Sequence, residues 1–191
     1  MSKKTAANDA PEMKWGIDTE LSERELWCIG KIVALWGSLE YEIFCQTLMY
    51  FSDGETKRSN LPKEMNNMQF SQVLALWKRH VVDNPAGERE EVLQKQYQRI
   101  TDLHDFRNAL VHGMWDWSVD APGKITAIRI RKKEIRRTHF TANDLASLAS
   151  ELETINFKVR FPGGLKDLAD AKMKEGAYVS RRFLLANAKQ G

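Results

Sequence analysis

The sequence predicts an all-α fold, a bundle of four to six helices with a small β-hairpin inserted after the third helix. Two observations support this fold class. In four long segments the apolar residues recur every three or four positions, as on the buried face of a helix. Between about residues 115 and 140 they alternate instead, as in a strand with one buried face. With 191 residues, the chain is long enough for one core and short for two.

The first predicted helix runs from about residue 18 to residue 51. Ser22 and Glu25 have the spacing of a capping box at its start. Gly30 and Gly37 lie inside it, and each costs about 1 kcal/mol relative to alanine in a helix. We therefore expect a close approach by another helix, or a slight bend, at these two positions. Ser52-Asp53-Gly54 ends the helix, and the polar run to Met68 is expected to be a loop.

Two further helices are predicted before the change of periodicity. The first spans about residues 69–82 and ends before Asn84-Pro85. The next spans about residues 88–111 and opens with acidic residues, which suit a helix N-terminus. Gly113 follows this helix and is suited to a left-handed capping conformation.

The alternating segment predicts a small hairpin or three-stranded flap. Thr141 then caps a fourth helix, with Asp144 three residues later, and Pro162-Gly163-Gly164 breaks that helix. The rest of the chain offers two weaker helical segments separated by Gly176. We divide the chain into a flexible lead-in (1–16), a helical domain (17–160) with its hairpin at about 115–140, and a C-terminal helical tail (161–191). In the tail, three apolar residues are candidates for docking onto the domain: Tyr178, Phe183 and Leu184.

Composition narrows the class of protein. No stretch approaches the roughly 18 apolar residues needed to span a bilayer, so we expect no membrane partner. Cys28 and Cys45 lie too far apart on one predicted helix to bridge, which favours buried, reduced thiols in a cytoplasmic protein. The four histidines form no metal-ligand spacing with them, so no metal site is predicted. A net charge of +3 and a pI of about 8.8 are compatible with a nucleic-acid substrate.

Polar residues gather near the end of the third helix. At about 100° per residue, His104, Arg107, Asn108 and His112 fall within one arc of roughly 140°. Leu103, Phe106 and Leu110 lie on the opposite side. One face of this helix end is therefore expected to pack while the other presents polar chemistry.

The segment Arg107-Asn108-Ala109-Leu110-Val111-His112-Gly113 resembles the R-x(4-6)-H motif of the HEPN superfamily, in which Asn often follows the Arg. The resemblance implies a small all-α bundle that forms a homodimer. It also implies a metal-independent and cofactor-independent endoribonuclease. In such enzymes the 2′-hydroxyl of the RNA attacks the adjacent phosphate and leaves a 2′,3′-cyclic phosphate and a 5′-hydroxyl. One position departs from the pattern, because several toxin members carry Tyr where this chain has Met114.

Under that resemblance, His112 would act as general base or acid and Arg107 would hold the phosphate as charge develops on it. Asn108 would hold a phosphate oxygen or orient the histidine, and His104 would support the site. The strand region carries the strongest charge cluster of the chain, which we expect on one exposed face in contact with phosphates. The predicted substrate-binding residues are His104, Arg129, Arg131, Lys133, Arg136 and Arg137. The family also suggests an antitoxin partner and a role in bacterial stress or phage defence.

Two other functions remain open at this point. The chain could be a noncatalytic HEPN-like dimer that binds RNA or a nucleotide, or a structural dimer whose motif stabilises its interface. In a structural role, Arg107 would form a salt bridge with Asp105 or Glu40, and His112 would cap the helix C-terminus. The tryptophans at periodic apolar positions are expected to pack rather than to stack on bases; they are Trp36, Trp77, Trp115 and Trp117.

Overall fold

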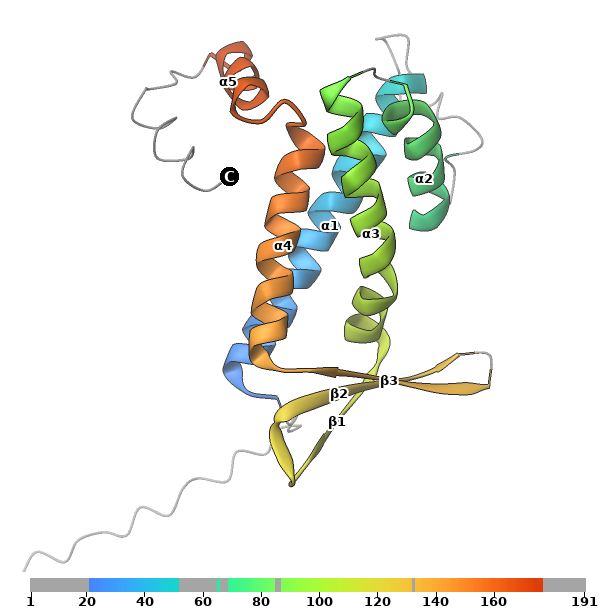
Figure 1. The fold of residues 1–191 in the computed structure, drawn as a ribbon, viewed down its shortest axis with the longest axis vertical. Helices are drawn as coiled ribbons and strands as arrows, with labels where there is room; N and C mark the ends of the chain where they lie inside the picture. The colour runs from blue at the N-terminus through green and yellow to red at the C-terminus, as the bar shows by residue number, and fades with distance from the viewer. Residues whose placement is uncertain (1–20, 52–64, 66–68, 85–86, 132, 177–191) are drawn as a thin grey trace, which may run out of the picture.

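The computed structural model describes residues 21–51, 65, 69–84, 87–131 and 133–176. This part of the chain is mostly helical, with one small antiparallel sheet at an end of the long helices (Figure 1). A helical fold with a β insertion is therefore confirmed. Three predicted segments lie outside the described residues: the lead-in, the loop after the first helix, and the proposed docking residues of the tail. Met65 is the exception within the loop, and it is buried.

The helices follow the predicted order. The long ones are α1 (Glu23–Phe51), α3 (Glu88–His112) and α4 (Ala142–Arg160), and the shorter ones are α2 (Phe70–Trp77) and α5 (Leu165–Lys174). A π-helical turn, η3 (Lys78–Val82), continues directly from α2. The predicted capping box of α1 is present, because the Ser22 backbone N–H donates to Glu25 Oε2 at 2.8 Å.

The inserted sheet has three strands in the order β1 (Met114–Ser118), β2 (Ala121–Arg131) and β3 (Glu134–Phe140). β1 follows α3 after a single residue and pairs with β2, with Trp115 opposite Ala127. In the second pair Ile125 lies opposite Phe140. Because β3 leads straight into α4, the sheet joins the ends of α3 and α4 (Figure 1).

Gly113 does not adopt the predicted left-handed conformation. Its backbone is extended, with φ −79° and ψ 151°, as the chain passes from α3 into β1. A side chain there would not fit, since a Cβ would lie 2.5 Å from the carbonyl oxygen of Ala109 and 3.0 Å from the Cβ of Ala127. Glycine is therefore needed for the close contact between the helix end and the sheet, not for its left-handed freedom.

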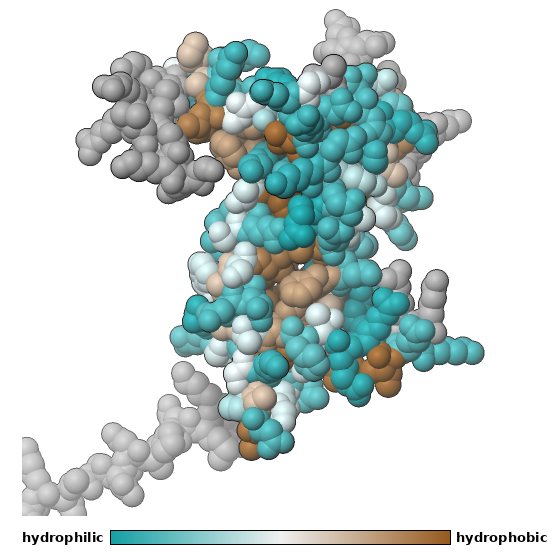
Figure 2. Space-filling model, in the orientation of Figure 1, coloured by the Kyte–Doolittle hydropathy of each residue, from teal (hydrophilic) through white to brown (hydrophobic). Residues whose placement is uncertain are grey.

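The core lies between α1, α3 and α4 and extends to one face of the sheet. Trp36 and Trp77 are at most 1% exposed, as predicted for packing residues. Phe140 brings β3 onto the core, with its ring 4.5 Å from that of Phe106 in an edge-to-face arrangement. Hydrophobic side chains show at the surface between α3 and α4 beside the sheet, whereas most of the visible face is hydrophilic (Figure 2).

Trp117 departs from the packing prediction, because its side chain is 41% exposed. Trp115 is half-buried and its ring centroid lies 6.1 Å from that of Phe140. The two residues differ because Trp117 lies close to the β1–β2 turn, which extends away from the helices (Figure 1).

The predicted cap of the fourth helix is also present. The Thr141 hydroxyl and backbone N–H both donate to Asp144 Oδ2, at 2.7 and 2.8 Å, and the Asp144 N–H donates back to Thr141 Oγ1 at 3.1 Å. These hydrogen bonds lower the pKa of the Asp144 carboxyl, the bond from the Thr141 side chain having the largest effect.

Cys28 is buried, Cys45 is partly buried, and both thiols are free. Among the described helices, none is long and apolar enough to cross a membrane.

Candidate functional site

The motif residues of α3 line one open cleft of about 610 Å³. Three other elements complete its walls, namely α1, the start of α2, and β2. The lining residues are Glu40, Gln69, Phe70, Ser71, His104, Arg107, Asn108, His112 and Arg129. The four polar residues predicted to share one face of this helix, His104, Arg107, Asn108 and His112, all line the cleft.

Helical spacing explains how α3 presents these side chains. His104, Asn108 and His112 are four residues apart and therefore lie above one another on one face. Ala109 and Leu110 are buried on the packing side, which holds this face toward the cleft. His112 is the last residue of α3 and is exposed. In the described part of the chain no hydrogen bond or ion pair holds its imidazole, so His112 does not serve as a side-chain cap there.

Arg107 is the most constrained member of the motif. Its Nη2 lies 3.6 Å from Glu40 Oε1, and its Nη1 donates to Asn108 Oδ1 at 3.2 Å. The guanidinium lies 5.9 Å from the centroid of the Trp36 ring. Its buried Nε has no hydrogen-bond partner among the described residues. The salt bridge to Glu40 expected for a structural role is therefore present, while one donor of the guanidinium stays unused.

Asn108 connects the arginine to the histidine one turn earlier. Its amide nitrogen lies 3.2 Å from His104 Nδ1, while its amide oxygen accepts from Arg107. Because the oxygen is already engaged, the amide group has a fixed orientation within the cleft. His104 Nδ1 also lies 4.0 Å from Asp105 Oδ1. His104 is half-buried, so its place between two neighbours suits support of the site better than direct contact with a substrate.

Arg129 reaches the cleft from β2 and is half-buried. It lies directly opposite Arg136 in the β2–β3 register, so two like charges share one face of the sheet. Asp105 of α3 lies 3.9 Å from Arg136 and offsets part of this repulsion. The two arginines also line a smaller pocket of about 260 Å³ beside the cleft, together with Asp102, Asp105, Phe106, Ala109 and Thr138.

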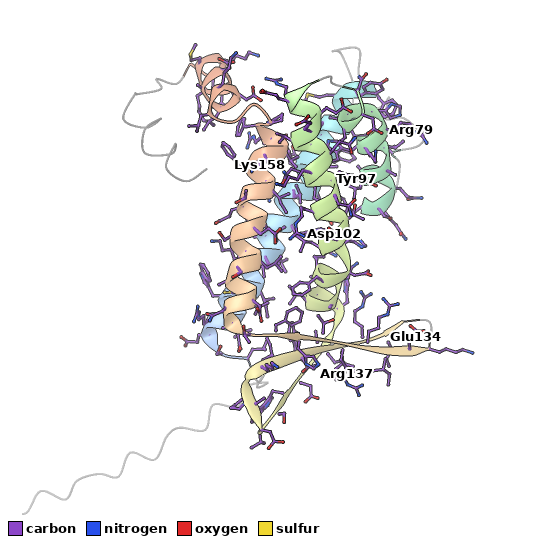
Figure 3. The ribbon with its side chains drawn as sticks, in the orientation of Figure 1. Arg79, Tyr97, Asp102, Glu134, Arg137 and Lys158 are labelled. Carbon is purple, nitrogen blue, oxygen red and sulfur yellow. The ribbon has the colours of Figure 1, made fainter. Side chains whose placement is uncertain are left out.

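The predicted single basic face of the strands is wrong. Side chains alternate across a sheet, so Arg129 and Arg136 face α3, whereas Arg137 lies on the opposite face, away from the helices (Figure 3). Lys133 is exposed in the β2–β3 turn, where its φ is 68°. Arg131 belongs to β2, and its side chain is outside the described residues. Of the five predicted substrate-binding residues whose side chains the structure describes, His104 and Arg129 line the cleft, and Lys133, Arg136 and Arg137 do not.

Three polar residues of the cleft were not predicted as site residues. Glu40 entered the sequence analysis only as a salt-bridge partner, and Gln69 and Ser71 carried no signal at all. Glu40 lies on α1, and Gln69 and Ser71 lie at the start of α2, which packs against α1. Among the described residues, no group of three or more His, Cys, Asp or Glu side chains is placed to hold a metal ion.

No protein-family model, characterised protein or solved structure matches this chain at significant similarity.

Proposed function

We propose that this protein is a HEPN-like, metal-independent endoribonuclease that cleaves RNA to a 2′,3′-cyclic phosphate and a 5′-hydroxyl. The observation that supports this proposal is the single cleft that gathers His104, Arg107, Asn108 and His112. An Arg and a His can occur five positions apart by chance, but chance gives no reason for both to line an open cleft together with another cationic side chain. Here Arg129 joins them from a different element.

Each step of such a cleavage has a candidate group in the cleft. The 2′-hydroxyl oxygen bonds to the adjacent phosphorus while the bond from phosphorus to the 5′-oxygen breaks. One proton leaves the 2′-hydroxyl and another reaches the departing 5′-oxygen. His112 is exposed at the cleft, and its imidazole can accept the first proton or donate the second. Arg107 and Arg129 stabilise the negative charge on the phosphate oxygens.

The Glu40–Arg107 contact favours the second candidate, a noncatalytic protein that binds RNA or a nucleotide in the same cleft. A carboxylate 3.6 Å from the guanidinium reduces the positive charge available to a phosphate. In this alternative Arg107 has too little free positive charge to stabilise the phosphate during cleavage, and the substrate is bound without being cut. The two candidates differ in one measurable respect, which is the appearance of cleaved ends.

The deciding experiment is incubation of single-stranded RNA with the wild type and with His112→Ala in the presence of EDTA, followed by analysis of the product ends. We expect the wild type to give cyclic phosphate and 5′-hydroxyl ends, and His112→Ala to lose cleavage while keeping its helical circular-dichroism spectrum. His139→Ala is the matched control, since His139 is exposed on β3 and bonds to Thr126 outside the cleft.

An unchanged cleavage rate in His112→Ala would remove the catalytic assignment. Binding of RNA by the wild type without any cut product would favour the noncatalytic alternative. The homodimer, the antitoxin partner, the defence role and the cytoplasmic location follow from the resemblance and the composition and stay predictions.

A further inference from the structure

The smaller pocket beside the cleft lies where the end of α3 meets the sheet (Figure 1). Its wall on α3 consists of residues at positions 102, 105, 106 and 109, a spacing that places them on one face of the helix. Its wall on the sheet comes from β2 and β3. A volume of about 260 Å³ is below the roughly 300–1,000 Å³ of pockets for drug-sized ligands, so it suits one planar ring system rather than a whole nucleotide.

The two walls of the smaller pocket carry opposite charges. The wall on α3 presents the carboxylates of Asp102 and Asp105, and the wall on the sheet presents the guanidinium groups of Arg129 and Arg136. Arg136 Nη1 lies 3.9 Å from Asp105 Oδ2, so an acceptor group and a donor group lie side by side. A phosphate would be repelled by the carboxylates. A neutral group that has both donors and acceptors matches both walls.

Phe106 adds an aromatic surface to the same pocket. Its ring is half-buried and makes an edge-to-face contact with Phe140, with the ring centroids 4.5 Å apart. This contact with a buried residue fixes the ring in place. Unstacked bases of single-stranded RNA bind on aromatic side chains while polar groups contact their edges, so the pocket has the features that a nucleobase requires.

We propose that the smaller pocket binds a guanine base of an RNA whose phosphate lies in the cleft. Guanine presents two neighbouring donors, N1–H and the 2-amino group, and two neighbouring acceptors, O6 and N7. Asp105 accepts from the two donors, and Arg136 donates to O6, which is next to N1–H on the base. Adenine and cytosine have one amino group beside an acceptor on this edge, and uracil has one N–H between two carbonyls. Guanine alone among the four bases offers a carboxylate two adjacent donors.

The position of Asp105 connects the base to the cleft. Asp105 precedes His112 by seven residues, so at about 100° per residue their side chains leave α3 within about 20° of one another, two turns apart. Arg129 lines both the smaller pocket and the cleft. A base in the pocket and a phosphate in the cleft can therefore belong to one RNA strand that passes Arg129. This base site rests on the proposed function, because RNA in the cleft supplies the base.

The test compares single-stranded uridine pentamers that carry guanine, hypoxanthine, adenine or cytosine at the central position. Every sugar is 2′-O-methylated, so no free 2′-hydroxyl is present and fluorescence anisotropy measures binding alone. We expect the wild type to bind the guanine pentamer about tenfold more tightly than the adenine, cytosine or all-uridine pentamer. Hypoxanthine is guanine without its 2-amino group, and its pentamer should bind about fivefold more weakly than the guanine pentamer.

Asp105→Asn should bind the guanine and hypoxanthine pentamers equally, because an amide offers one acceptor atom where the carboxylate offers two. Its affinity for the all-uridine pentamer should not fall, since a negative charge is removed beside Arg136. That second measurement also reports on the cleft, because Asp105 lies 4.0 Å from His104. Glu134→Gln is the matched control. Glu134 lies 3.6 Å from Arg136 but does not line the smaller pocket, so this variant should keep the wild-type preference for guanine.

Equal affinity of the wild type for all the pentamers, or no binding of any of them, overturns the guanine site. A guanine preference that survives in Asp105→Asn overturns it as well, as does an equal loss of that preference in Glu134→Gln, which would trace the effect to the charge of Arg136. RNA cleavage without a guanine preference would leave the proposed function standing and remove this site. A guanine preference without cleaved ends would contradict the nuclease and leave the site standing.

Discussion

The carboxylate of Glu40, on α1, contacts both Trp36 of the same helix and Arg107 of α3. Glu40 Oε1 accepts a hydrogen bond from Trp36 Nε1 at 2.8 Å and lies 3.6 Å from Arg107 Nη2. Trp36 is 1% exposed, so this carboxylate satisfies a buried indole and positions the motif arginine at the same time. The contact ties the candidate site to the core of the helical bundle.

Replacement of Glu40 separates these two roles. Glu40→Gln keeps an oxygen that can accept from Trp36 but removes the negative charge, so we expect single-stranded RNA to bind several-fold more tightly in fluorescence anisotropy. Glu40→Ala removes the acceptor as well, and the free energy of unfolding should fall by about 1–3 kcal/mol in urea titrations. Equal RNA affinity of the wild type and Glu40→Gln would show that the phosphate does not approach Arg107.

Arg129 and Arg137 form a matched pair for testing the cleft. Both are cations of the sheet, but Arg129 faces α3 in the cleft and Arg137 lies on the opposite face. We expect Arg129→Ala to weaken RNA binding about tenfold and to reduce the salt dependence of log K by roughly one phosphate contact. Arg137→Ala should change both quantities much less. An equal loss of RNA affinity in both variants would contradict this assignment, because it would indicate diffuse attraction of RNA to the whole sheet.

Gly113 tests the junction between α3 and β1. Gly113→Ala would force a Cβ to within 2.5 Å of the Ala109 carbonyl oxygen, so the helix end or the sheet must shift. We expect a loss of about 1–3 kcal/mol in the free energy of unfolding. Gly123→Ala is the control in β2, where a Cβ would meet no atom of the described residues within 4 Å, and its effect should stay within about 0.5 kcal/mol. Equal stability of the two variants would contradict the close contact.

The capping box of α4 predicts a pH dependence of stability. Hydrogen bonds from Thr141 lower the pKa of the Asp144 carboxyl in the folded protein. A lowered carboxyl pKa stabilises the fold at pH values above the unfolded-state pKa of about 3.9, and this contribution is lost as the pH falls through the lower folded-state pKa. Asp144→Asn should therefore be less stable than the wild type at pH 6, and the difference should shrink in acid.

Urea unfolding at pH 6 and at several values below pH 4 measures this difference. Asp170→Asn, at an exposed position of α5, serves as the control and should follow the wild type at every pH. A constant difference between Asp144→Asn and the wild type across this range would show that the carboxylate charge does not contribute to the cap.

Much of the fold could be predicted from local patterns. The Ser22–Glu25 and Thr141–Asp144 caps and the change from helical to alternating periodicity near Trp115 all involve residues close in sequence. Local hydrogen bonds and side-chain periodicity decide such features, so a single segment contains the necessary information. The conformation of Gly113 was predicted wrongly, because the sheet that crowds it is completed by Ala127 from another strand.

The candidate site, too, was predictable within one helix and not beyond it. By itself the sequence determined that His104, Arg107, Asn108 and His112 share one face of α3, since helical geometry fixes their spacing. Only the tertiary structure decided that Glu40 and Arg129 join them, that the strand cations divide between two faces, and that a smaller pocket lies beside the cleft. Those relationships depend on how helices and strands distant in sequence pack against each other. The periodicity of one segment does not show which other segments pack against it.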